Sequence, residues 1–277
     1  MITSPALQLR RAFFPLTERK FTYARYEALL DDLADESRFR VVPLGELAGV
    51  VDTDRAVVCL RHDVDERLDR AADFARLEHE RGLRATYYVL HTARYWRARD
   101  LVPMLLHMQD VLGHEIGWHN DLVTLECVLG LDARATLAAE LERLRGAGLR
   151  IVGTSSHGSP ACYRYGFHNG YFFFPTPVPG FPNVDVVDGP FGPKHVPRGT
   201  LEEFRFDYEA YHLDHDLYFS DAAFDASGAR WHTDQLDLGV CTPGSRTIVL
   251  THPDHWDRSA ARKLGRFAWK VADKVRR

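Results

Sequence analysis

The sequence predicts an α/β fold with a mainly parallel sheet. Short apolar segments alternate with segments of helical periodicity, and polar motifs follow the ends of two of the apolar segments. Strands that alternate with helices pair in parallel, so their carboxyl ends meet at one rim, where functional groups gather. A length of 277 residues, with 45% hydrophobic and 27% charged residues, suits one such domain with a full core and appended segments.

The first half of the chain contains two predicted strand-helix units. Residues 56–60 are apolar and predict a strand, and residues 66–81 carry leucine and alanine at helical spacing. Residues 83–90 have the β-branched and aromatic bias of a buried strand. The pattern then repeats, because residues 101–112 predict a second helix and residues 114–119 a third strand.

The second half alternates less regularly. Asp132 is placed to cap a third helix, which ends before a fourth predicted strand at residues 149–152. Proline and glycine interrupt residues 160–200, so this stretch predicts an irregular, partly extended insertion with a short strand at residues 184–187. Regular elements return at residues 216–220, at residues 247–250 and in a final helix that begins near Asp257.

Composition argues against several classes of protein. The N-terminus lacks an apolar stretch followed by a small-residue cleavage site, and no run approaches about 18 apolar residues, so we expect a cytoplasmic protein. Four widely spaced cysteines without a Cys-x-x-Cys pair indicate neither a disulfide framework nor a thiolate zinc site. A net charge of −4 argues against a nucleic-acid partner. The oligomeric state is not predicted.

Basic residues are concentrated at the end of the chain. Residues 258–277 hold eight Lys or Arg and one Asp, within the predicted final helix. Such a helix would suit peripheral contact with an anionic membrane surface. The alternative is that these side chains form the solvated outer face of a terminal helix.

Two acidic residues follow the first predicted strand. Asp63 and Asp65 alternate in an Arg-His-Asp-Val-Asp motif, so they point the same way if the strand continues. Their charges then compete unless a cation lies between them, and one would bind metal while the other accepts a proton. The alternative is that Asp65 caps the helix at Glu66 and that Asp63 pairs with Arg61.

Histidines also follow predicted strands. His119 ends a Gly-His-Glu-Ile-Gly-Trp-His motif, and its place at a strand exit favours it as a metal ligand over His114, which fits a hydrogen-bonded structural residue. Asn120 and Asp121 would orient the His119 ring. His252 follows the last predicted strand. Asp and His residues gathered at strand ends indicate metal-assisted hydrolysis.

In their order along the chain, these motifs resemble the landmarks of polysaccharide deacetylases with the NodB-type fold. The Asp-Val-Asp, Ala-Thr-Tyr-Tyr-Val, Gly-His-Glu-Ile-Gly-Trp-His and Ile-Val-Leu-Thr-His motifs carry the resemblance, over roughly residues 50–260. It implies a distorted (β/α)₇ barrel at residues 51–277, with the insertion near 160–200, and an N-terminal segment at residues 1–50 that packs on it. An Arg-His-Asp-Val-Asp branch linked to surface-polysaccharide synthesis is more similar than the secreted chitin or peptidoglycan deacetylases.

The resemblance also implies roles for individual residues. Asp63 resembles the catalytic base and His252 the general acid. Asp65 and His119 resemble ligands of one divalent ion, and zinc suits such a mixed carboxylate and histidine site. Substrate would be a sugar or a glycan precursor.

The chain departs from the family pattern at two positions. The second metal-binding histidine of the family stands four residues beyond the first, where this chain has Val123. His157 is the favoured replacement, because the loop after the fourth predicted strand should reach the same rim. The arginine that usually follows the fourth strand is also displaced, and Arg164 is the nearest candidate.

The hypothesis is therefore a metal-dependent hydrolase that acts on a C-N bond other than a peptide bond. It would remove an N-acetyl (or O-acetyl) group from a sugar in a nucleotide-linked or lipid-linked precursor of a surface polysaccharide. Two alternatives stay open: a catalytically silent carbohydrate-binding homologue, which Val123 favours, and a hydrolase of another C-N bond. Tyr218, Asp221 and Trp231 would line a cleft for a sugar ring or pack in the core, without a catalytic role.

Overall fold

A curled parallel sheet forms the centre of the molecule. The computed structural model describes residues 21–174, 180–182, 184–196, 198–222 and 236–256. The strands of the sheet are β1 (Phe39–Val41), β2 (Ala56–Val64), β3 (Thr86–Leu90), β4 (Glu115–Asn120), β5 (Gly153–Ser156), β8 (Tyr208–Glu209), β9 (Leu217–Ser220) and β10 (Arg246–Thr251). Seven of them form a half-barrel in the order β8-β5-β4-β3-β2-β10-β9, and β1 pairs with β2. All these pairs are parallel, which confirms the predicted α/β class.

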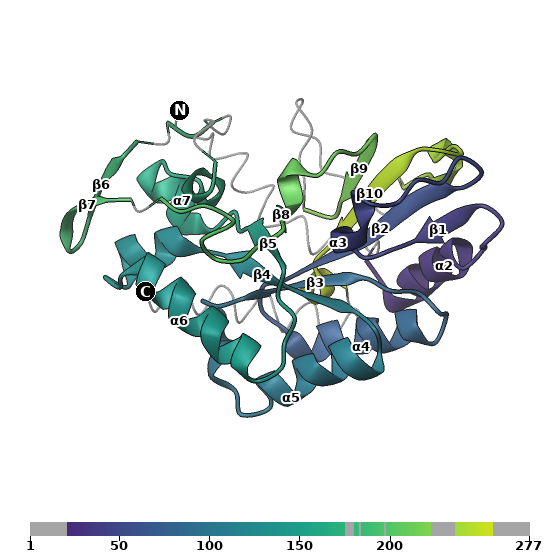
Figure 1. Ribbon diagram of the computed structural model, residues 1–277, viewed down its shortest axis with the longest axis horizontal. Coiled ribbons are helices and arrows are strands. Elements are labelled where there is room, and N and C mark those ends of the chain that lie inside the picture. Colours follow the sequence, from purple (N-terminus) through teal and green to yellow (C-terminus); the bar gives the residue numbers. More distant parts are fainter. Residues whose placement is uncertain (1–20, 175–179, 183, 197, 223–235, 257–277) are drawn as a thin grey trace.

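Helices cover the outer face of this sheet, where α4, α5 and α6 lie along one side (Figure 1). The α-helices are α2 (Tyr23–Leu33), α3 (Leu44–Leu47), α4 (Leu68–His79), α5 (Leu101–Leu106), α6 (Ala133–Gly146) and α7 (Pro160–Tyr165). Single turns are η1 (Arg94–Arg97), η2 (His107–Val111), η3 (Thr124–Val128), η4 (Asn169–Phe172), η5 (Ala210–His212), η7 (Leu238–Val240) and η8 (Pro253–His255). Asp132 caps α6 as predicted, because its side chain accepts a hydrogen bond from the backbone N–H of Ala135.

The central strand β2 is longer than the sequence predicts. The predicted strand ends at residue 60, whereas β2 continues to Val64 and all its residues are buried. It pairs with β10 along one edge and with β3 over Arg61 to Val64 along the other. Asp63 therefore lies inside a strand, and its side chain shares a face with that of Arg61.

Strand β5 begins later in the chain than the sequence predicts. The sequence predicts a strand at residues 149–152, but the paired strand β5 begins after this segment. Two backbone groups of the predicted segment form hydrogen bonds with side chains. The Arg150 N–H donates to Gln109 Oε1 at 2.7 Å, and the Ile151 C=O accepts from the Arg145 side chain at 2.6 Å. Of this segment, Val152 C=O accepts from the Asp207 N–H at 2.7 Å, and the register with β8 begins only at the next residue, Gly153.

The predicted insertion at residues 160–200 contains more regular structure than expected. It includes α7, η4 and an antiparallel hairpin of β6 (Val186–Gly189) and β7 (Gly192–His195), which projects at one end of the molecule (Figure 1). The predicted final helix and its basic residues lie outside the described residues. Among the described segments, no helix has the length and apolar run that crossing a lipid bilayer requires.

Tyrosine rings fill the inside of the half-barrel below its rim. Tyr88 and Tyr208 are buried, and their hydroxyls are 2.9 Å apart. A Cβ atom at Gly117 would lie 2.4 Å from the Tyr88 ring, and one at Gly153 would lie 2.3 Å from the Tyr208 ring, so only glycine admits the rings. The inside of the half-barrel is therefore filled by side chains, and a ligand site is confined to the rim.

A buried carboxylate links the outer face of β2 to α4. Glu78 accepts hydrogen bonds from the hydroxyls of Tyr26 and Tyr87, the latter at 2.6 Å, and its Oε1 lies 2.7 Å from His62 Nε2. The other ring nitrogen of His62 lies 2.7 Å from Thr251 Oγ1, on β10. This network joins β2 and β10 just before the rim.

Replacement of Glu78 by leucine is expected to reduce the free energy of unfolding by about 3–5 kcal/mol, because two hydroxyls and an imidazole lose their buried partner. Urea unfolding monitored by tryptophan fluorescence measures this loss. Glu80→Leu is the matched control, since Glu80 is the exposed residue that ends the same helix and it pairs with Arg76 at the surface. A loss below about 1 kcal/mol for Glu78→Leu would contradict the structural role given to the network.

Candidate functional site

Three side chains converge at the rim of the sheet. Asp65 follows β2, His119 lies near the end of β4, and His157 follows β5. His119 Nε2 is 3.4 Å and His157 Nε2 is 3.7 Å from Asp65 Oδ1. One potential ligand atom from each residue lies within 4.8 Å of the others. The structure thus brings together the three residues that the sequence nominates as metal ligands.

Two of these converging atoms have no hydrogen-bond partner. Asp65 Oδ1 and His119 Nε2 are buried, and neither makes a hydrogen bond of acceptable geometry within the described residues. The other nitrogen of His119 lies 2.9 Å from the carbonyl oxygen of Ser155 and donates to it, which leaves the Nε2 lone pair facing Asp65. Buried polar atoms without partners are costly, and a cation among them would satisfy both.

Asp121 orients His157 rather than His119. The sequence predicts that Asn120 and Asp121 hold the His119 ring, but Asp121 Oδ2 lies 3.5 Å from His157 Nδ1. Burial lowers the pKa of His157, but Asp65 and Asp121 outweigh it and raise this pKa well above its usual range. Without a cation, His157 therefore holds a proton, and a metal ion would compete with it. The carbonyl of Asn120 accepts from the His157 backbone N–H at 2.8 Å, so its role is to fix the loop.

Asp63 forms a two-pronged ion pair with Arg61. The Nε and Nη2 atoms of Arg61 donate to the two carboxylate oxygens at 3.0 and 2.9 Å, and His119 Nε2 lies 3.5 Å from Asp63 Oδ2. Burial raises the pKa of Asp63, but Arg61 and His119 outweigh it and keep this pKa below its usual range. The alternative that Asp63 pairs with Arg61 is therefore confirmed, whereas its second part, for Asp65, is not. Asp65 does not cap a helix, since α4 begins at Leu68.

Arg61, rather than the predicted Arg164, is the arginine that pairs with Asp63. Arg61 is fully buried, and its Nη atoms also donate to Ser155 Oγ at 2.5 Å and to Tyr218 OH at 3.4 Å. The guanidinium of Arg164 instead lies over the ring of Tyr165, 5.4 Å from its centroid, on α7. Tyr218 also packs against a buried apolar cluster, so of its two alternatives the structure shows the core packing, and the cleft for a sugar ring stays a prediction.

His252 is paired with a carboxylate to which the sequence assigns no catalytic role. His252 Nδ1 lies 2.5 Å from Asp221 Oδ1, and its backbone N–H donates to Asp221 Oδ2 at 2.8 Å. Burial lowers the pKa of His252, but Asp221 outweighs it and raises the pKa to about 10. Its Nε2 is 4.0 Å from Asp65 Oδ2. The one feature of the sequence that points to Asp221 is its position directly after a predicted strand. Trp231, which the sequence groups with it, lies outside the described residues.

Two other positions considered from the sequence are structural. Val123 is buried in an apolar cluster, and its backbone N–H donates to Asn169 Oδ1 at 2.9 Å, so it offers no ligand atom. His114 is buried away from the rim, where Nδ1 accepts from Ala85 N–H at 3.1 Å and Nε2 donates to the carbonyl of Ala75 at 2.8 Å. His114 is therefore the hydrogen-bonded structural histidine that the sequence predicts.

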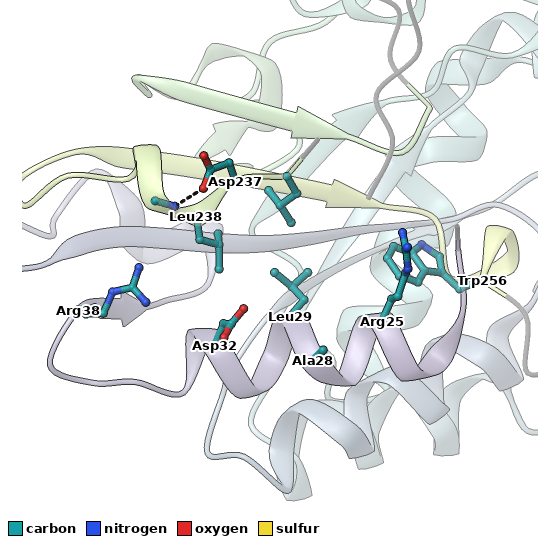
Figure 2. A pocket seen from close by; sticks show the side chains of 10 residues that line it. Arg25, Ala28, Leu29, Asp32, Arg38, Asp237, Leu238 and Trp256 are labelled. Carbon is teal, nitrogen blue, oxygen red and sulfur yellow. Dashed lines mark hydrogen bonds between the residues drawn. The ribbon is translucent and has the colours of Figure 1, made fainter. Parts of the chain in front are cut away.

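A cavity of about 550 Å³ lies away from this site (Figure 2). It lies between α2 and the segment around Asp237, and Arg25, Asp32 and Arg38 contribute to its lining. None of the residues nominated as ligands or as proton-transfer groups lines it. The proposed ligands and proton-transfer groups therefore lie at the rim and not in this cavity.

Neither a protein-family model nor a curated protein sequence matches the chain. Among solved structures, it is similar to a family 4 carbohydrate esterase from Bacillus anthracis, with 14% identity and a TM-score of 0.34 over 90% of this chain and 85% of that one. It is also similar to the chitin deacetylase from the fungal pathogen Colletotrichum lindemuthianum, with 14% identity and a TM-score of 0.36 over 82% of this chain and 84% of that one. Both likenesses are distant in sequence and in structure.

Proposed function

We propose that this chain is a metal-dependent hydrolase that removes an N-acetyl (or O-acetyl) group from a sugar in a surface-polysaccharide precursor. The observation that carries the proposal is the convergence of Asp65, His119 and His157, with a carboxylate oxygen and an imidazole nitrogen that lack partners. Two histidines and one carboxylate suit zinc at a site with an open position for water or substrate. The carboxylate of Asp121 behind His157 is the kind of support that such ligands have.

The residues around the three proposed ligands suit hydrolysis of an amide. A divalent ion held there would polarise the acetyl carbonyl and lower the pKa of a water molecule. Asp63, held in place by Arg61, accepts the proton of the attacking water. Protonated His252, held by Asp221, donates a proton to the amine that leaves.

The geometry weighs against the silent carbohydrate-binding alternative. That alternative rests on Val123, but His157 reaches the position next to Asp65 and His119 from another strand end. A hydrolase of another C-N bond would use the same groups, and a panel of acetylated sugars, amides and cyclic ureides would distinguish it. Contact of the basic residues 258–277 with an anionic membrane remains a further proposal, which a vesicle-binding assay with and without this segment would test.

The purified chain is expected to bind one zinc ion, and alanine at Asp65, His119 or His157 is expected to weaken binding by at least about a hundredfold. Each substitution removes one of three ligands, and the remaining two hold the ion poorly. Metal analysis after dialysis and competition with a chromogenic chelator measure these affinities. Because His157 must lose its proton, affinity should increase as the pH rises.

His195→Ala is the matched control, because His195 is exposed on the β6-β7 hairpin. It should bind zinc as the unchanged chain does, and both should release acetate from acetylated sugar substrates. Zinc binding that survives all three ligand substitutions would overturn the proposed centre. Stoichiometric zinc without acetate release from any sugar would overturn the deacetylase assignment while leaving the metal site.

A further inference from the structure

A second cluster of potential metal ligands lies beside the proposed centre. Asp221 directly follows β9, His252 directly follows β10, and His255 is the last residue of η8. One potential ligand atom from each residue lies within 4.8 Å of the others. Two imidazoles and one carboxylate suit zinc at a site with an open position. The proposed function uses His252 and Asp221 for proton transfer and gives His255 no role.

The short turn η8 places the two histidine rings side by side. The His255 N–H donates to the carbonyl of His252 at 2.8 Å, and Pro253 begins the turn. Side chains three residues apart eclipse one another in a 3₁₀ turn, and the two rings are stacked, with centroids 4.7 Å apart and 29° between their planes. Both Nδ1 atoms face the carboxylate of Asp221, at 2.5 Å for His252 and 3.3 Å for His255.

The nitrogen of His255 that faces Asp221 makes no hydrogen bond. Asp221 Oδ2 accepts from the backbone N–H of His252 at 2.8 Å and from the indole of Trp256 at 3.0 Å, and these donors occupy its two lone pairs. His255 Nδ1 is buried, and within the described residues it has no hydrogen-bond partner of acceptable geometry. Such an atom is costly, and a cation between it and the carboxylate would satisfy it.

The cluster can be reached from solvent on one side. The Asp221 side chain is fully buried, and that of His252 is 10% exposed, whereas that of His255 is 23% exposed. A metal site needs a path by which the ion enters, and the partly exposed ring of His255 marks such a path.

We infer that Asp221, His252 and His255 form a second divalent-cation site, and that an ion bound there inhibits the proposed reaction. The ion displaces the proton of His252 Nδ1 to solvent, so the ring keeps a proton only on Nε2. To donate that proton, a neutral ring would have to become an imidazolate, so it is a much weaker acid than the imidazolium. The inhibition rests on the proposed function, whereas the site rests on the geometry of the three residues.

Calorimetric titration with zinc at pH 8 tests the site. The unchanged chain is expected to bind a second ion about a hundredfold more weakly than the first, because His252 Nδ1 has to give up its hydrogen bond to the Asp221 carboxylate. Dialysis then removes this ion and leaves the ion of the proposed centre. His255→Ala and His255→Phe should each lose the weaker ion, and phenylalanine keeps a stacked ring without a nitrogen. His195→Ala, at an exposed histidine of the β6-β7 hairpin, is the matched control and should bind both ions.

Acetate release measures the inhibition. In the unchanged chain, the rate should fall at least about tenfold between one equivalent of zinc and an excess that fills the weaker site, because the proposed acid is lost. The ratio of the two rates should stay near one in His255→Ala and His255→Phe. A ratio near one in the unchanged chain, with both ions bound, would overturn the inhibition.

The absence of any ion that depends on His255, or loss of the weaker ion in His195→Ala, would overturn the second site. Asp65→Ala separates this result from the fate of the proposed function. A chain whose single ion is lost in Asp65→Ala and retained in His255→Ala keeps the proposed centre and loses the second site. A chain whose single ion depends on His255 and not on Asp65 keeps the second site and loses the proposed centre.

Discussion

Replacement of Asp63 by asparagine is expected to lower kcat for deacetylation about a thousandfold, while the chain still binds one zinc ion. Asparagine has the shape of aspartate and still accepts a hydrogen bond from Arg61, but its amide takes no proton from water. The proposed metal ligands are other residues, so the binding of the ion should change little. Acetate release under saturating substrate and metal analysis of the same preparation measure the two quantities.

Asp188→Asn is the control for this prediction. It makes the same chemical change at a residue that is exposed on the β6-β7 hairpin. It should retain full activity. If Asp63→Asn keeps more than a tenth of the activity, another group accepts the proton. If Asp63→Asn loses its zinc instead, Asp63 is a ligand, and the division of roles between Asp63 and Asp65 is wrong.

The sequence identifies the residues at the rim because strand ends are local features. Asp65 and His157 directly follow strands, His119 lies near the end of one, and parallel pairing brings the ends of these strands together. His157 is predictable from the sequence because its loop leaves the strand next to that of His119. The order of the strands, rather than the spacing of the residues along the chain, makes this inference possible.

The sequence predicts the pairing partners less well, because these depend on how far each strand runs. The Arg61 side chain points to Asp63 only because β2 continues to Val64, beyond the apolar run that predicts the strand. A strand buried on both faces can hold charged residues when they pair with each other, and periodicity does not reveal this. The sequence therefore favours Arg164, although Arg61 stands in the motif itself.

The sequence does not predict the contacts that join segments on either side of the insertion, for a different reason. The pairing of β5 with β8 lets the Ser156 N–H donate to Glu209 Oε1 at 2.9 Å, although 53 positions separate the two residues along the chain. Only the closing of the sheet brings their polar groups together. Asp221 and His252 are likewise joined by the pairing of β9 with β10.

Replacement of Asp221 by asparagine is expected to move the alkaline limit of activity to lower pH. With Asp221 present, the pKa of His252 is raised to about 10, so the proposed acid stays protonated through neutral pH. Without the carboxylate, this pKa falls toward its usual value of about 6.5, and burial lowers it further. Activity requires the protonated form, so kcat at pH 8 should decrease at least about 30-fold, and the loss should become smaller as the pH falls. The pH profile of kcat measures this shift.

This shift separates proton donation from a merely structural role of the pair. Asp221 also accepts from the Trp256 indole at 3.0 Å, so a structural defect would lower activity equally at every pH and would reduce the free energy of unfolding. A loss confined to the alkaline side, with unfolding little changed, requires that His252 titrates during catalysis. His252→Gln extends the argument, because a side chain that does not titrate should abolish the alkaline limb and leave a low, flat rate. A limb that survives in His252→Gln would assign the acid to another group, and His255, whose Nδ1 lies 3.3 Å from Asp221 Oδ2, would then be the residue to replace.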